Sequence, residues 1–198
     1  QQEVDTMRKK MSNTMFVAMV GVMGALVFAA NYLYVPLPAV AGTTPRIHMG
    51  NIMCLLAGLT LGPIPGGIAA GVGSLFFDLT NPLYVSSAPF TLIFKFLMAF
   101  VCGQIAWGRE AQAKSFKRNI VAGVLGQLTY IILYLGKDLI TNLFFNRVEI
   151  QTALVSLAQK GITSTINGII AVVFAIPLSF ALRKGLEQAN LHGLRDMR

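Results

Sequence analysis

Long apolar runs separated by short polar segments dominate the pattern of this chain. Runs of about 20 apolar residues are typical of transmembrane helices. Six runs can be distinguished, at residues 13–34, 49–61, 66–79, 90–107, 119–143 and 154–182. The pattern predicts an all-α integral membrane protein in which 1–198 form a single membrane domain. Residues 13–183 would form a six-transmembrane-helix bundle with short loops.

The second and third runs are shorter than the others. A helix of about 14 residues rises only about 21 Å, which is less than the thickness of the hydrocarbon core. Both runs are rich in glycine, and the turn Gly62-Pro63-Ile64-Pro65-Gly66 separates them. Small residues favour close helix packing in membranes. We therefore expect these two helices to lie inside the bundle rather than against lipid.

The charges support a membrane location and set an orientation. The chain is 55% hydrophobic and 12% charged, with a formal net charge of +8. Its basic residues lie mainly at the ends of apolar runs, so the charge indicates membrane topology rather than binding of nucleic acid. Eleven of the sixteen lie in residues 1–12, 108–118 and 183–198. The positive-inside rule then predicts that both termini, residues 1–12 and 184–198, are cytoplasmic.

Three lysines interrupt segments that otherwise favour lipid. They are Lys95 in the fourth apolar run, Lys137 in the fifth and Lys160 in the sixth. An ionisable side chain at membrane depth costs a few kcal/mol, so it usually faces the protein interior and marks a ligand or ion path. The three lysines predict a site for a polar ligand, one with negative charge.

Further polar residues are predicted at the same outer depth. We expect one outward-opening pocket there, covered by the loop between the first two helices. Its predicted substrate-binding residues are Arg46, His48, Asn51, Asp78, Lys95, Tyr130, Tyr134, Lys137 and Asn167. The histidines form no metal-ligand pattern, and neither a metal nor a cofactor is expected in this chain.

Structural roles are open for several of these residues. Lys137 and Asp138 could both reach the headgroup region, as could Lys160. Lys95 could serve only as the ion-pair partner of Asp78. Tyr130 and Tyr134 could belong to an interfacial aromatic belt.

The sequence carries no HExxH motif, no GxSxG motif and no Walker A lysine motif. We therefore expect that this chain is not an enzyme and does not hydrolyse ATP. In the first helix, Ala18, Gly21 and Ala25 are spaced at intervals of three and four and share one face. Such a face lets another helix approach closely. It would either bind a partner protein or pack within the bundle.

Residues 47–103 resemble the membrane-embedded substrate-binding subunits (S components) of energy-coupling factor (ECF) transporters. Four motifs carry the resemblance. They are a glycine and amide opening the second helix (Gly50-Asn51), an L-x-L-G-P turn (Leu59–Pro63), G-x-G-S-x-x-x-D closing the third helix (Gly71–Asp78), and A-P-x-T-x-x-x-K entering the fourth (Ala88–Lys95).

The resemblance implies a multi-pass subunit in a prokaryotic plasma membrane that binds a vitamin or vitamin precursor beneath the first outer loop. It also implies two kinds of partner, a transmembrane coupling subunit and two ATP-binding-cassette ATPases that use the ATP. In this family the S component topples in the membrane to release its substrate, and a small-residue face on the first helix docks on the coupling subunit.

The excess of basic over acidic residues in the predicted pocket favours a carboxylate, and pantothenate is the first substrate expected. Hydroxymethylpyrimidine and pyridoxine come next, because Tyr130 or Tyr134 could stack on a ring. Two other classes of function stay open. One is an autonomous channel or facilitator for small solutes, and the other is a membrane enzyme that uses lysine and aspartate as acid–base groups.

Overall fold

The computed structural model describes the backbone of residues 2–38, 45–108 and 111–188, and the side chains of 14–38, 45–108 and 111–185. The predicted cytoplasmic segments therefore lie largely outside the described side chains. The elements in chain order are α1 (Gln2–Asn31), β1 (Tyr34–Pro36), β2 (Arg46–His48), α2 (Gly50–Leu61), α3 (Pro63–Thr80), η1 (Val85–Ser87), α4 (Ala88–Trp107), α5 (Phe116–Ile140), η2 (Thr141–Phe145) and α6 (Ile150–Gln188).

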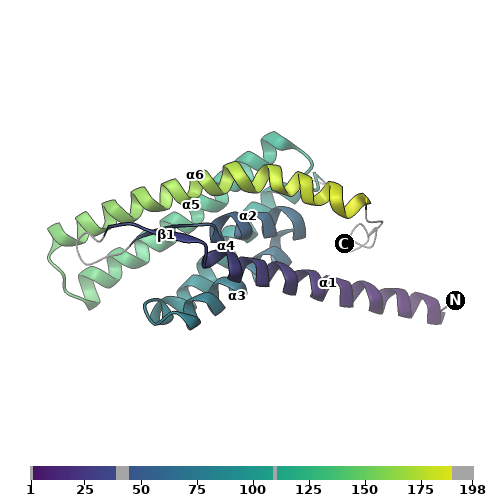
Figure 1. Ribbon diagram of the computed structural model, residues 1–198, viewed down its shortest axis with the longest axis horizontal. Coiled ribbons are helices and arrows are strands. Elements are labelled where there is room, and N and C mark those ends of the chain that lie inside the picture. The colour runs from purple at the N-terminus through teal and green to yellow at the C-terminus, as the bar shows by residue number, and fades with distance from the viewer. Residues whose placement is uncertain (1, 39–44, 109–110, 189–198) are drawn as a thin grey trace.

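The six α-helices pack into an elongated bundle. The start of α1 and the end of α6 lie toward the same end of it, and the connection between α5 and α6 lies at the other (Figure 1). Four described helical stretches are long and apolar enough to cross a membrane, namely Thr14–Asn31, Val85–Trp107, Phe116–Phe145 and Ile150–Gly185. This supports an all-α membrane protein.

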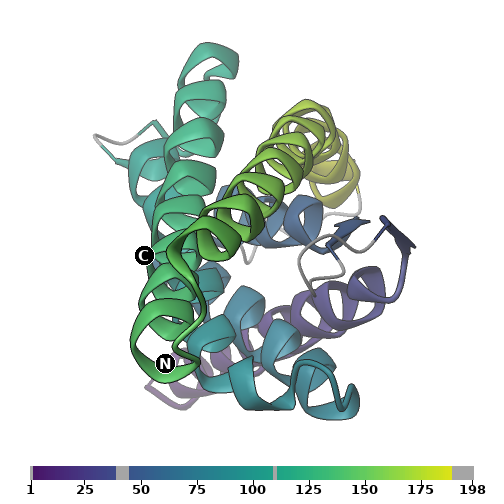
Figure 2. The ribbon, with the colours of Figure 1, turned by 90° about the vertical axis from the view of Figure 1, so that its left-hand side faces the viewer.

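Of the remaining two helices, α2 lies in the inner part of the bundle, whereas α3, which was expected there too, exposes one apolar face, with Ile64 and Phe76 58% and 55% exposed. Nine of the twelve residues of α2 are buried. This helix packs against α1, α3, α4 and α6 and lies near the middle of the end view (Figure 2). Its shortness is compatible with this position, because protein rather than lipid surrounds most of it.

The turn between α2 and α3 is tighter than the five-residue turn expected from the sequence. Gly62 alone separates the two helices, with a φ of 88° that an L-residue rarely adopts. Helix α3 then begins at Pro63, because proline is well tolerated in the first helical turn, where its missing N–H would have no helical partner.

The polar segment between α1 and α2 also differs from the expected loop. Its described part forms a short antiparallel hairpin in which Tyr34 pairs with His48 and Pro36 pairs with Arg46. At the end of the bundle opposite the start of α1, α5 continues into the π-helix η2 and α6 begins at Ile150, so both helices extend beyond the predicted runs.

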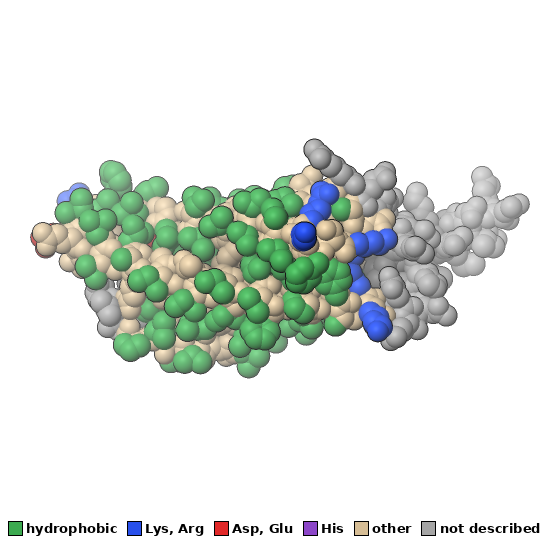
Figure 3. Space-filling model, turned by 90° about the horizontal axis from the view of Figure 1, so that it is seen from above, with side chains coloured by type: hydrophobic (Ala, Val, Ile, Leu, Met, Phe, Trp, Pro, Cys, Tyr) green, Lys and Arg blue, Asp and Glu red, His purple; other side chains and the backbone are tan. Residues whose placement is uncertain are grey.

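The surface agrees with a lipid environment. Large apolar side chains are exposed along the helices, for example Val17 on α1 and Ile162 on α6, which are 68% and 64% exposed. On the face shown in Figure 3, lysine and arginine side chains gather toward the end where α1 starts and α6 ends, and hydrophobic side chains cover most of the rest. This distribution matches the positive-inside pattern.

Candidate functional site

Lys95 lies where three helices meet in the interior. It is on α4 and only 3% exposed. Its Nζ donates a hydrogen bond to Oδ1 of Asn51, in the first turn of α2, and lies 3.8 Å from the ring centroid of Tyr130 on α5. A buried ammonium needs such contacts to offset the loss of water. The fourth predicted span thus brings a cation to the centre of the protein.

Asn167 on α6 holds the hairpin above this centre. Its Oδ1 accepts a hydrogen bond from the backbone N–H of His48 at 3.0 Å, and its Nδ2 donates to the backbone carbonyl of Arg46 at 2.9 Å. The side-chain amide therefore pairs with β2 much as a neighbouring strand would. Asn167 contacts the hairpin directly, and its role as a ligand contact stays a prediction.

Arg46 anchors the hairpin through aromatic rings. Its guanidinium carbon lies 4.4 Å from the ring centroids of both Phe77 and Tyr84, and 5.3 Å from that of Tyr34. These rings come from α3, the segment before α4, and β1. A cation–π contact stabilises by about 0.5–1 kcal/mol at an exposed site and by about 2 kcal/mol when it is desolvated. The hairpin is thus fastened to both sides of the bundle.

His48 is the most deeply buried residue of β2, with 8% of its surface exposed. Burial, together with the positive charges of Lys95 and Arg46, lowers the pKa of His48 well below its usual value. The imidazole is therefore neutral at physiological pH. Its charged form would be stable only where water reaches it.

Asp78 at the end of α3 is buried, and the Thr91 side chain forms a hydrogen bond with it. The hydrogen bond from Lys95 goes to Asn51 instead. The simple Lys95–Asp78 pair considered from the sequence is therefore not what holds the lysine in this structure.

The three lysines do not converge on one point. Lys160 forms an ion pair with Asp138, with 2.6 Å between Nζ and Oδ1. Lys137 donates to Ser87 Oγ at 3.3 Å. Lys137 and Asp138 are neighbours on α5, and successive helix positions point about 100° apart, so they reach different helices. Of the three, only Lys95 lies in the deep interior.

Tyr130 and Tyr134 lie one turn apart on α5 and their rings stack, with centroids 5.6 Å apart and planes at 9°. Tyr130 is the ring beneath Lys95. Sequence reasoning missed Gln127 on the same face of α5, and also Phe77 and Tyr84, which contact Arg46. The spacing of three between Gln127 and Tyr130 was a usable signal for the first of these.

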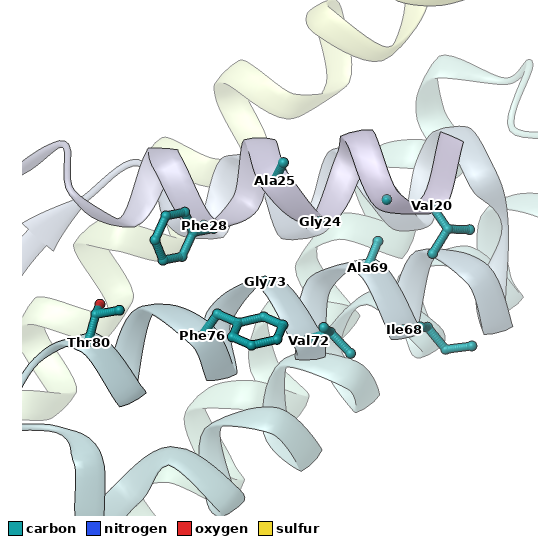
Figure 4. A pocket seen from close by; sticks show the side chains of 11 residues that line it. Val20, Gly24, Ala25, Phe28, Ile68, Ala69, Val72, Gly73, Phe76 and Thr80 are labelled. Carbon is teal, nitrogen blue, oxygen red and sulfur yellow. The ribbon is translucent and has the colours of Figure 1, made fainter. Parts of the chain in front are cut away.

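The small-residue face of α1 borders a groove on the outside of the bundle. Ala18, Gly21 and Ala25 are all exposed, and a Cβ added at Gly21 would meet nothing within 4 Å. The groove, about 470 Å³, lies between α1 and α3 and is almost entirely apolar (Figure 4). Packing within the bundle therefore does not explain Gly21, whereas Gly24 beside it does pack against α3.

Comparison with known proteins agrees with this architecture. The family model described as "ECF-type riboflavin transporter, S component" matches residues 11–184. A protein of Pyrococcus woesei, described as "Uncharacterized protein in gap 3'region", is 31% identical over 97 residues. That match takes in 49% of this chain and 62% of the relative, so the chain spans less than two thirds of the relative's length. Since the family match extends over nearly all of the described residues, the chain belongs to the S components of ECF-type transporters.

Proposed function

We propose that this chain captures a water-soluble vitamin at the outer side of a prokaryotic plasma membrane and delivers it to an ATP-driven importer. The observation that carries the proposal is Lys95, an ammonium group buried between α2, α4 and α5 beneath the β1–β2 hairpin. Such a buried cation marks a ligand site at membrane depth. The hairpin would act as the lid, because it covers the interior polar groups.

The topology that goes with this function is a bundle in which all six α-helices count as spans and both termini are cytoplasmic. Two features support it. The chain ends of the described bundle lie on one side (Figure 1), and lysine and arginine gather on that side (Figure 3). The lid then lies on the outer side, where the substrate arrives.

Energy would come from partner proteins. An S component works with a transmembrane coupling subunit and two ATP-binding-cassette ATPases, as the family implies. We propose the exposed face of Ala18, Gly21 and Ala25 as the docking surface for the coupling subunit. Small residues there allow a partner helix to approach to a short interaxial distance, and the apolar groove beside them would receive its side chains.

The structure changes the order of the expected substrates. The carboxylate argument depended on several unpaired cations, but Lys160 is paired with Asp138 and Arg46 is enclosed by aromatic rings. The stacked tyrosines on α5 favour a flat ring. We therefore place riboflavin, which the family description names, before pantothenate, with hydroxymethylpyrimidine and pyridoxine as further candidates.

The direct test is to purify the protein in detergent, identify any co-eluting small molecule by mass spectrometry, and titrate the four vitamins against ligand-free protein. Binding of one vitamin with clear preference supports the proposal. Absence of binding to all four, with no co-eluting molecule, contradicts it.

Reconstitution separates this function from an autonomous facilitator. Liposomes that contain only this chain should take up no vitamin, and uptake should need the coupling subunit, the ATPases and ATP. Uptake down a gradient by the chain alone would favour a facilitator.

A further inference from the structure

Gln127 is a buried amide without a partner in the described structure. It lies on α5, is 3% exposed, and neither its Nε2 nor its Oε1 forms a hydrogen bond there. Leaving a buried donor or acceptor unpaired costs about 1–3 kcal/mol, so most such groups are paired in native proteins. Here both ends of one side chain are unpaired at once.

The neighbouring helix makes room for this side chain. A Cβ added at Gly168 on α6 would lie 2.6 Å from Cγ of Gln127 and 3.4 Å from its Nε2. Even alanine at 168 would therefore displace the amide. The absence of a side chain at Gly168 permits the observed position of Gln127, so the two residues form one structural unit.

This unit borders the Lys95 site. Gln127 precedes Tyr130 by three residues, about 4.5 Å along the helix axis, and shares a helix face with it. Tyr130 is the ring below Lys95. On the other side, Gly168 directly follows Asn167, which binds the lid. The unpaired amide thus shares a helix face with the ring below Lys95 and packs against the turn of α6 that carries Asn167.

We infer that Gln127 is a specificity-determining residue that binds the neutral edge of a heterocyclic ring, where an N–H donor lies beside a carbonyl acceptor. A primary amide offers one acceptor and donors side by side, so it matches a lactam or imide edge with two hydrogen bonds. A simple carboxylate could use only Nε2 and would leave Oε1 unpaired. This inference rests on the proposed function and adds the chemistry by which the same site selects its substrate.

The test uses riboflavin, which carries an imide edge, and its N3-methyl analogue, in which the imide N–H is replaced by a methyl group. The ligand-free protein should bind riboflavin at least about 10-fold more tightly than the analogue. Gln127→Leu should lose about 10- to 100-fold in riboflavin affinity and with it the discrimination between the two ligands. Gly168→Ala should likewise lower the riboflavin affinity and the preference for riboflavin over the analogue, because it displaces the Gln127 amide.

Gln104→Leu is the matched control, since Gln104 is an exposed residue of α4. It should leave both affinities unchanged. Melting temperatures of all variants show whether they fold. The ratio of the affinities of the unaltered protein for riboflavin and for the N3-methyl analogue requires no variant. It therefore tests the inference even if Gln127→Leu does not fold.

Equal affinity of the unaltered protein for riboflavin and its analogue overturns the inference, as does a lack of riboflavin binding. The proposed function survives either result if another vitamin binds and Lys95→Met abolishes that binding. If the protein binds no vitamin at all, both the inference and the proposed function are contradicted.

Discussion

Asn167 binds the backbone on both sides of Ile47, accepting from the N–H of His48 and donating to the carbonyl of Arg46. A side chain from the last helix thereby takes the place of a third strand beside the β1–β2 hairpin. The position of the hairpin over Lys95 depends on an amide that supplies a donor and an acceptor together.

Asn167→Asp should loosen the lid. A carboxylate still accepts from the His48 N–H but has no donor for the Arg46 carbonyl, so two acceptors face each other. We expect backbone amide exchange at residues 46–48 to become about 10-fold faster in the ligand-free protein, and vitamin release to accelerate. Hydrogen exchange is the informative measurement, because a residue that only contacts ligand would not alter it. Unchanged exchange would show that Asn167 does not hold the hairpin.

Protonation of His48 at low pH should destabilise the closed position of the β1–β2 hairpin. Its pKa is lowered when it is buried near Lys95 and Arg46, so the closed state binds fewer protons than a state in which the imidazole meets water. The closed state is therefore fully favoured above the ordinary histidine pKa of about 6.5 and loses stability as pH falls below it. Vitamin affinity measured from pH 7.5 to 5 should decline in the acid range.

His48→Gln removes the titrating group and should flatten that decline. If the variant and the unaltered protein lose affinity in parallel, another group is responsible.

The ion pair of Lys160 and Asp138 should matter for stability and not for binding. The two side chains are 15% and 12% exposed, and removal of one partner leaves a largely buried charge. Lys160→Met should lower the free energy of unfolding by about 1–3 kcal/mol, seen as a lower melting temperature. Lys160→Met combined with Asp138→Leu should recover most of the loss. A large fall in vitamin affinity with normal stability would instead place Lys160 in the site.

A bulky side chain on the exposed small-residue face of α1 should impair ATP-driven uptake while leaving vitamin binding intact. Gly21 is exposed, and a side chain there has open space, so Gly21→Leu should fold and bind vitamin normally. It should weaken assembly with the coupling subunit and reduce ATP-driven uptake by at least about 10-fold. Gly136→Leu is the matched control, because Gly136 on α5 is equally open. Normal uptake by Gly21→Leu would remove this face from the docking surface.

Much of the fold follows from the sequence pattern, because the spacing of apolar runs decides which segments can cross a membrane. The shortness and the glycines of residues 49–79 correctly indicated an inner helix for α2, but not for α3, which exposes one apolar face. The hairpin did not follow, since strands of three residues give no periodic signal and β2 is bound by a residue 119 positions away from His48, Asn167.

The site was predictable only in part for a related reason. A lysine in an apolar run can be recognised from the sequence because of its charge. Its partner cannot, because helix packing determines which residue lies beside it. Asn51 rather than Asp78 binds Lys95, and Asp138 binds Lys160 rather than its neighbour Lys137. Gln127 carries no charge and appears in the sequence as one polar residue among many. Its burial without a partner becomes visible only in three dimensions.

The central claim is tested most directly by equilibrium titration of vitamin into purified, ligand-free protein and its Lys95→Met variant. Methionine keeps the length and apolar contacts of the lysine but removes the ammonium that Asn51 and Tyr130 surround. A charge-assisted contact in a buried site is worth roughly 1.5–3 kcal/mol. We predict a loss of affinity of at least about 10-fold with little change in melting temperature. Equal affinity of the two proteins would contradict the account, because no other described cation occupies the centre of the bundle.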